Sequence, residues 1–287
     1  RPATSIEDPV RAIVTVDVTK VVKQSLRIPI QAQGTVTPLQ ETSVVSEVNG
    51  RIIEVSPFFI VGGFVSKGDV LLRIDPRNYE TNLLRAEASV KSAQSSLAQE
   101  TGRAKVAEQE WQKSPKGGQR TQAAKDLYLR KPQLDQALSQ MLAAQADLNT
   151  ARDNLERTSI RAPYDALIRT KHSELGQFVA AGTPLVDIFS VEYAQVRLPI
   201  PQNKLKYLEL PELGTMQNGS PVDLYTEVGG QIKRWSAYMH HTEGVFDARS
   251  RVLFSVVRIE DPYGLQYPRA EPLRIGTFVN ARIEGKE

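Results

Sequence analysis

The chain has 287 residues, of which 40% are hydrophobic and 24% charged, and its formal net charge at pH 7 is +3. This composition is typical of a folded protein rather than a disordered one, and no apolar run is long enough to span a bilayer as a helix. The absence of cysteine excludes thiol catalysis, disulfide bonds and cysteine-ligated zinc. The basic residues are dispersed and lack interleaved aromatic residues, so we expect no nucleic-acid ligand.

The first quarter of the chain has the pattern of β-structure. Apolar and polar residues alternate from Val14 to Val18, which predicts a strand with one solvent-facing side. A longer β-rich stretch runs from Ile28 to Asp75 and carries turn signals at residues 49–50 and 62–63.

The pattern becomes helical between Arg77 and Lys113, a stretch with no proline and a single glycine. Apolar residues recur there in alternating steps of three and four. This seam consists of Leu83, Ala86, Val90, Ala93, Leu97, Ala104, Ala107 and Trp111, with Glu100 as its one polar member. The heptad spacing and the many alanines predict a helix that packs closely against another helix.

A second heptad run follows a break at residues 114–118, where a proline and paired glycines end the first helix. It consists of Leu127, Leu134, Met141, Leu148 and Leu155, with Ala137, Ala144 and Ala151 between them. Two such helices can bury their seams only against each other. We therefore predict an antiparallel coiled-coil hairpin about 55 Å long, at 1.5 Å per residue.

Pro132 lies inside the second arm and disfavours helical backbone at Lys131. Because the heptad register passes through it and the arms then match in length, we expect a kinked but continuous helix. The alternative is a short separate helix at about residues 120–130, which would broaden the tip.

β-Signals return after Thr158 and continue to the end of the chain. Alternating stretches occur at 196–200 and 279–283, and turn residues punctuate the sequence at short intervals. This pattern is typical of a small antiparallel barrel or sandwich.

The β-segments on either side of the predicted hairpin repeat each other. Gly62–Ile74 and Gly176–Ile188 share two glycines, a Phe-Val pair, a leucine and an isoleucine at equivalent positions. The glycines suit tight strand connections, which need positive φ. Each copy supplies too few strands for a core, so we expect the two halves to pack together as one β-domain.

A β-domain of two such halves resembles the biotinyl/lipoyl carrier fold. A helical hairpin inserted between the halves resembles the membrane fusion proteins (HlyD-like periplasmic adaptors) of RND-type tripartite efflux pumps. Residues 155–165 are similar to the family's exit from the hairpin, residues 127–137 to its tip segment, and residues 249–251 with 275–279 to its barrel signature.

The resemblance implies a mainly β, elongated and modular protein, with a long coiled-coil hairpin between two halves of a lipoyl-like domain, followed by a small antiparallel β-barrel. The expected modules are residues 1–29 as part of a membrane-proximal module, 30–43 with 191–287 as the β-barrel, 44–76 with 160–190 as the lipoyl-like domain, and 77–159 as the hairpin with its tip near 113–131.

The resemblance also suggests three groups of functional residues. The channel-docking tip would use Arg120, Lys125, Leu127, Arg130 and Lys131; the half-motif turns Gly50, Gly62, Gly68, Gly176 and Gly182; and the barrel signature Arg249, Arg251, Gly276 and Phe278. Residues 113–131 carry six basic residues and one acid, a charge that would steer encounter with acidic helix ends of a channel. The alternative is an ordinary solvated helix end.

We expect no catalysis, cofactor or metal. The turn after Ile74, where a carrier domain would present its modified lysine, is occupied by the helical insertion. His240 and His241 are adjacent, and neighbouring residues of a strand point to opposite faces, so a shared metal ion is not expected. No set of nucleophile, histidine and acid can be assembled.

The function predicted from this resemblance is coupling between membranes. An inner-membrane RND transporter would contact the barrel end, the hairpin would reach an outer-membrane channel, and several copies would form a ring through adjacent hairpins and lipoyl-like domains. The expected location is the periplasm, with an inner-membrane anchor preceding Arg1. Bending near residues 42–46, 75–79, 157–162 and 189–193 would transmit the state of the pump. The alternatives are an adaptor of an ABC-type exporter and a lipoyl/biotinyl carrier domain.

Overall fold

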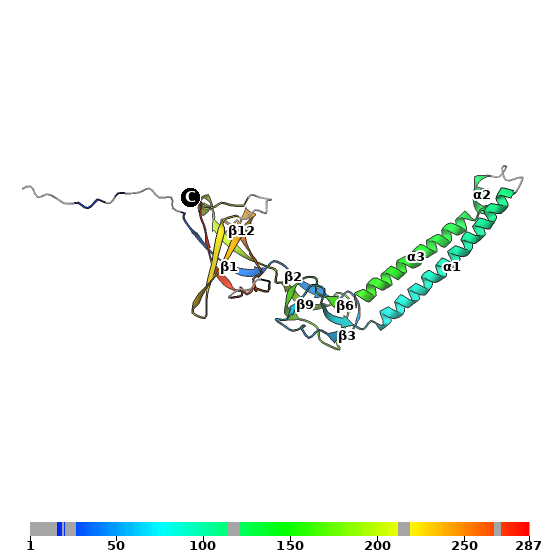
Figure 1. The fold of residues 1–287 in the computed structure, drawn as a ribbon, viewed down its shortest axis with the longest axis horizontal. Helices are drawn as coiled ribbons and strands as arrows, with labels where there is room; N and C mark the ends of the chain where they lie inside the picture. Colours follow the sequence, from blue (N-terminus) through cyan, green and yellow to red (C-terminus); the bar gives the residue numbers. More distant parts are fainter. Residues whose placement is uncertain are drawn as a thin grey trace, which may run out of the picture.

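The computed structural model describes residues 16–18, 20, 27–113, 121–211, 219–266 and 271–286. Three parts follow one another along an elongated molecule: a β-barrel, a small β-sandwich and a pair of long helices (Figure 1). This arrangement confirms the predicted mainly β fold with a small barrel and a long helix.

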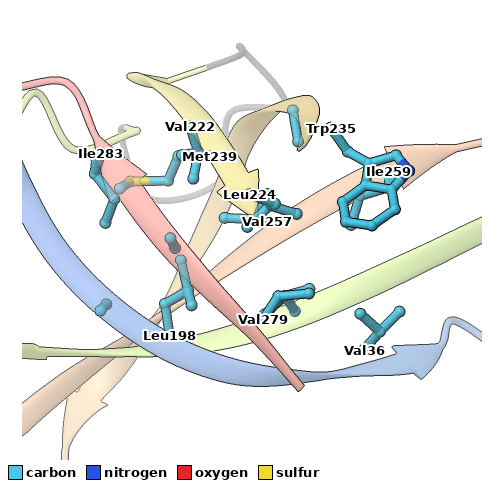
Figure 2. Packing of buried hydrophobic residues seen from close by; sticks show 14 of the residues in the cluster. Val36, Leu198, Val222, Leu224, Trp235, Met239, Val257, Ile259, Val279 and Ile283 are labelled. Atoms are coloured by element: carbon cyan, nitrogen blue, oxygen red, sulfur yellow. The ribbon is translucent and has the colours of Figure 1, made fainter. Parts of the chain in front are cut away.

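The barrel is closed by six antiparallel strands in the order β1-β10-β13-β12-β11-β14. Their bounds are Ile30–Pro38, Tyr193–Pro201, Val252–Glu260, Gln231–Phe246, Pro221–Val228 and Phe278–Ile283, in that order, and a 3-10 turn at Gln202–Tyr207 follows β10. Alternate side chains fill the interior, among them Leu198, Leu224 and Met239 (Figure 2). At Gly34 a Cβ would lie 2.7 Å from the Arg197 carbonyl oxygen, so strands β1 and β10 can approach only because this residue is glycine.

The sandwich consists of two four-stranded sheets with matching strand orders, β2-β9-β7-β4 and β6-β5-β3-β8. The strands before the helices are β2 (Glu41–Val45), β3 (Gly50–Val55), β4 (Phe64–Val65) and β5 (Val70–Ile74), and those after them are β6 (Ser159–Arg161), β7 (Ala166–Lys171), β8 (Phe178–Val179) and β9 (Pro184–Ser190). Each strand of the first set has its counterpart in the other sheet. Fully buried residues from both sets, such as Leu71 and Leu185, share one core.

The helical part consists of α1 (Arg77–Lys113), α2 (Gln122–Tyr128) and α3 (Lys131–Glu156). α1 and α3 lie side by side (Figure 1), and Val90 of α1 packs against Ala144 and Leu148 of α3. The heptad residues within α1 and α3 are the least exposed ones, and most other side chains of these helices face outward. The prediction is wrong for Leu127, the first residue of the second run, which lies on α2 and is 62% exposed.

The expectation of a kinked continuous arm through Pro132 is wrong. The chain leaves helical geometry at Arg130, whose φ is 59°, and α3 starts afresh with Pro132 in its first turn. Proline is favourable there because the first turn leaves its N–H groups unpaired in any case. The alternative with a separate short helix is therefore the observed one, and the arms differ in length: α1 has 37 residues and α3 has 26.

The strand predicted at residues 14–18 is not formed over its described part. Val16 and Val18 pair with no strand of the described part of the chain and are 70% and 89% exposed, and Val14 lies outside the described residues. Alternation alone was misleading here, because a strand also needs a neighbouring strand to pair with.

Within the described ranges, none of the helices combines the length and the hydropathy that crossing a membrane would require.

Candidate functional site

The tip of the helical pair is built around a contact between two aromatic rings, whose planes are inclined at 50°. The N-cap of α2 is Thr121, whose Oγ1 accepts a hydrogen bond from Ala124 N (3.4 Å). At the other end of α2, the Tyr128 ring lies 5.2 Å from the Trp111 ring between centroids. An aromatic pair at this separation is attractive beyond its buried area, so it holds α2 against the end of α1.

Arg130 closes the seam between the helices at the seam's one polar position. Its left-handed backbone directs the guanidinium toward α1, where Nε and Nη2 donate to Oε2 of Glu100 at 3.0 and 2.8 Å. These hydrogen bonds hold the pKa of Glu100 below its ordinary value. The sequence indicated that Glu100 is the one polar residue on the seam. Its ion-pair partner could not be predicted, because Arg130 was expected to lie within a continuous helix rather than in a left-handed turn.

The other predicted tip residues lie around the turn between α2 and α3. Lys131 Nζ is 2.6 Å from Asp126 Oδ1 and lowers the pKa of that carboxyl. Leu127 is 62% exposed on α2, and Lys125 is half-buried. Arg120 lies outside the described residues. The turn thus groups four of the five predicted residues, and two of its cations are paired with acids of the same chain.

A shallow groove runs along α1 beside this tip, with a volume of about 560 Å³. It is lined by Ala98, Gln99, Gly102, Arg103, Val106, Ala107, Glu110 and Arg130. Gly102 leaves the groove open at its middle, because no atom lies within 4 Å of where its Cβ would be. Sequence reasoning missed the groove, although the single glycine of a long helix was a signal for it.

The turn glycines of the two sandwich halves have nearly identical backbones. Gly62 and Gly176 have φ of 82° and 83°, and Gly68 and Gly182 have φ of 88° and 86°. Gly50 is required for another reason: a Cβ there would lie 2.5 Å from Cγ2 of Ile74. These glycines are spread over several turns of the sandwich, so they do not form a single site.

The residues of the predicted barrel signature lie at opposite ends of the barrel. Arg249 and Arg251 are exposed in the turn between β12 and β13, where the Asp247 carboxylate accepts hydrogen bonds from the backbone N–H groups of Arg249 and Ser250 (3.1 and 2.8 Å). These bonds lower the pKa of Asp247. Gly276, with φ of 89°, and Phe278 lie at the start of β14, toward the sandwich.

The expectation that His240 and His241 point to opposite faces is wrong. The ladder between β12 and β13 has a bulge between Met239 and His241, and this irregularity brings the two Nδ1 atoms within 2.9 Å. A bulge breaks strict alternation of side chains. Burial, followed by the nearby Arg258 charge, lowers the pKa of His240. In the part of the chain that the structure describes, no three metal-ligating residues of the His, Cys, Asp and Glu types gather.

The sandwich and the inserted helices match a known family. Residues 40–189 match the model of the "RND MFP, barrel-sandwich hybrid domain", in which MFP stands for membrane fusion protein. This match covers more than half of the chain, and the chain belongs to this family of membrane fusion proteins.

Individual proteins are similar to this chain in sequence or in fold. The multidrug resistance protein MdtA of Yersinia enterocolitica is 24% identical over 255 residues, which are 88% of this chain and 54% of MdtA. The chain thus spans about half the length of that relative. A putative efflux transporter from Bacteroides eggerthii has a similar structure (TM-score 0.64, 17% identity, 92% of this chain and 73% of that one). MacA from Actinobacillus actinomycetemcomitans is also similar (TM-score 0.61, 21% identity, 94% and 82%).

Proposed function

We propose that this chain is a periplasmic adaptor subunit that links an inner-membrane RND efflux transporter to an outer-membrane channel. The observation that carries the proposal is the insertion of a long helical pair between the two halves of a sandwich that belongs to the RND membrane fusion family. The helices extend away from the barrel (Figure 1), so the two ends of the molecule are available to partners in different membranes.

The modules have distinct roles in this proposal. The two sets of sandwich strands act as lipoyl-like halves (44–76 with 160–190), and the helices at 77–159 act as a hairpin that reaches the channel. The barrel (30–43 with 191–287) faces the transporter, with residues 1–29 belonging to a membrane-proximal module near an N-terminal anchor. Several copies assemble into a ring through neighbouring hairpins and lipoyl-like domains.

The tip is the proposed contact with the channel. The exposed Leu127 supplies apolar surface there, and Lys125 supplies a positive charge beside it. Arg130 and Lys131 are engaged with Glu100 and Asp126, so we assign them to shaping the turn as much as to contacting a partner. Hydrophobic surface with a nearby charge is suited to a specific but reversible contact.

The proposed adaptor role involves no catalytic step. No modified lysine stands at the turn of the sandwich after Ile74, where α1 begins three residues later at Arg77. This is the feature that disfavours the carrier-domain alternative. An ABC-type exporter as the inner-membrane partner is the second candidate, since the sandwich and helices would serve that role equally well.

The test is purification of the tagged full-length protein from detergent-solubilised native membranes, followed by mass spectrometry of its partners. Recovery of an RND transporter together with an outer-membrane channel is the expected result. An ABC transporter in place of the RND protein would retain the adaptor role and change the energy source to ATP. Recovery of soluble carrier-dependent enzymes alone would overturn the proposal.

A further inference from the structure

The barrel and the sandwich are joined by two very short connections. β1 ends at Pro38 and β2 begins at Glu41, while β9 ends at Ser190 and β10 begins at Tyr193. The connections are bonded to their surroundings: Leu39 N donates to the Tyr193 carbonyl (3.3 Å), and Ser190 N donates to the Gln40 carbonyl (2.9 Å). Two adjacent connections restrict twisting but still allow bending about the line that joins them, in the manner of a door hinge.

A third contact crosses this junction away from the two connections. Tyr263, from the segment that follows β13 of the barrel, packs edge-on against Phe64 of β4 in the sandwich. The ring centroids are 5.8 Å apart and the ring planes are inclined at 80°. This is the favoured edge-to-face geometry of aromatic pairs. A contact to β4, at the edge of its sheet, opposes bending about the hinge line.

The backbone around Tyr263 is fixed by Asp261. Asp261 has a left-handed φ of 44°, and its carboxylate accepts hydrogen bonds from Leu265 N (2.7 Å) and Gln266 N (2.9 Å). Its own N–H donates to the carbonyl of Glu192, in the connection between the modules (2.8 Å). The left-handed backbone is unfavourable for a residue with a Cβ, and these bonds offset that strain.

The Tyr263 ring itself is also held. Its hydroxyl oxygen accepts a hydrogen bond from Ile275 N (3.3 Å), and partial burial raises the pKa of the phenol. The ring is therefore presented to the sandwich in one orientation by groups from both ends of the connection between β13 and β14.

The repeat within the sandwich provides an internal comparison. Phe178 of β8 occupies the position in the second half that Phe64 occupies in the first. Phe178 is 68% exposed and Phe64 is 42% exposed. Among the described residues, no aromatic ring is paired with Phe178. The sandwich thus accommodates an unpaired phenylalanine at this position, and the contact of Phe64 serves the junction rather than the sandwich itself.

We propose that Tyr263 and Phe64 form a latch that fixes the angle between the barrel and the sandwich. The residues 189–193, predicted from the sequence to act as a hinge, are then part of a rigid joint. If the chain is an adaptor, as proposed above, the latch passes motion of the barrel directly to the sandwich and leaves bending to the base of the helices. This last consequence rests on the proposed function, whereas the latch does not.

The latch is tested by measuring the distance distribution between two spin labels on the purified full-length chain. Because the chain has no cysteine, Val245→Cys in the barrel and Ala181→Cys in the sandwich would be the only labelled positions. Both residues are exposed. The chain without further changes is expected to give a narrow distribution. Phe64→Ala and Tyr263→Ala are each expected to broaden it by about twofold, because one ring of the pair is lost.

Two matched variants serve as controls. Phe178→Ala removes the same side chain from the equivalent strand and is expected to leave the distribution narrow. Tyr263→Phe keeps the ring pair and loses only the hydrogen bond from Ile275 N, so it is expected to broaden the distribution less than Tyr263→Ala. Should Phe64→Ala fail to fold, Tyr263→Ala tests the same contact from the barrel side.

The latch is overturned if the two alanine variants that remove the contact give distributions as narrow as that of Phe178→Ala. The measurement uses no partner protein, so its outcome is independent of whether the chain recovers a transporter and a channel from membranes.

Discussion

The barrel and the helical pair differ most in how they bury apolar residues. Among the described residues, the barrel encloses a cluster of nineteen buried ones, whereas the cluster between α1 and α3 contains three, Val90, Ala144 and Leu148. A closed barrel has an inside that its own strands fill, while two helices can hide only one stripe each. The helices also keep large apolar side chains on the surface, including Leu84, Leu138 and Leu142, each at least 42% exposed.

This difference indicates which parts of the molecule are stabilised by their own cores and which are not. The β-modules carry their stability within their own cores, so they provide a rigid frame. The helical pair depends on a thin alanine-rich seam and a few ion pairs, and most of its surface is available to partners. We therefore expect substitutions in the barrel core to affect folding and substitutions on the helices to affect local order.

The largest expected effect is that of Leu198→Ala in the barrel core. Leu198 is fully buried, and the cavity left by truncation is expected to cost about 3 kcal/mol of unfolding free energy. Urea denaturation followed by Trp235 fluorescence, in a Trp111→Phe background, isolates the barrel signal. The exposed Ile232→Ala is the control and should change stability by less than about 0.5 kcal/mol. Equal effects of both substitutions would contradict the description of the barrel core.

A smaller effect is expected for Leu148→Ala in the seam of the helices. Leu148 is 5% exposed, and we expect a loss of about 2 kcal/mol, at the low end for a buried leucine, because a thin helical pair can relax around the gap. The measurement is thermal loss of helical circular dichroism. Leu142→Ala, on the same helix but 57% exposed, is the matched control and should be nearly neutral. A larger loss for Leu142→Ala would show that the seam is wrongly placed.

Gly102→Ala is expected to stabilise α1 by about 1 kcal/mol, because alanine is a far better helix former than glycine. No atom lies within 4 Å of the new methyl group. The control is Gly63→Ala in the sandwich, where the methyl group would lie 2.2 Å from the Phe58 carbonyl oxygen and must destabilise. The midpoint of thermal unfolding is measured for both variants. It should rise for Gly102→Ala, where the methyl group has space, and fall for Gly63→Ala, where it does not. A destabilised Gly102→Ala would mean that the groove is filled in solution.

The smallest expected effect is a loosening of the tip in acid. The pKa of Glu100 is lowered in the folded tip, chiefly by Arg130, so the pair stabilises the tip above the unfolded-state pKa of this carboxyl. That contribution is lost as the pH falls through the folded-state pKa. Iodide quenching of Trp111 fluorescence, in a Trp235→Phe background, should increase in that acidic range. Glu100→Gln should show the higher quenching already at neutral pH, and Glu108→Gln should not. A flat quenching profile in the unsubstituted chain would contradict this role of the pair.

The sequence predicted the elements with strong periodicity and missed those set by a single residue's backbone. The heptad seams of α1 and α3 follow from spacing that extends over many residues. For the strands after the helices the spacing left a barrel and a sandwich open, and the choice of a barrel came from the family resemblance. The restart of α3 depends on one left-handed residue, Arg130, and the approach of His240 to His241 depends on one bulge. Neither leaves a periodic trace in the sequence, since each is stabilised by contacts with distant segments.

The candidate tip was predicted in part for the same reason. Basic residues near Leu127 could be read from the sequence, whereas the pairing of Arg130 with Glu100 spans thirty positions along the chain and required the structure. The Tyr263–Phe64 contact joins segments even farther apart, and neither residue stands out from its neighbours in the sequence.

The central claim, that the two ends of the molecule meet partners in different membranes, is tested most directly by site-specific photo-crosslinking in cells. A photoreactive residue replaces Leu127 at the helical tip in one strain and Val245, near the end of β12 in the barrel, in another. Both side chains are more than 60% exposed. The account predicts that the Leu127 position captures an outer-membrane channel and the Val245 position an inner-membrane transporter. Capture of the same soluble protein from both positions, or of no membrane protein from either, would contradict it.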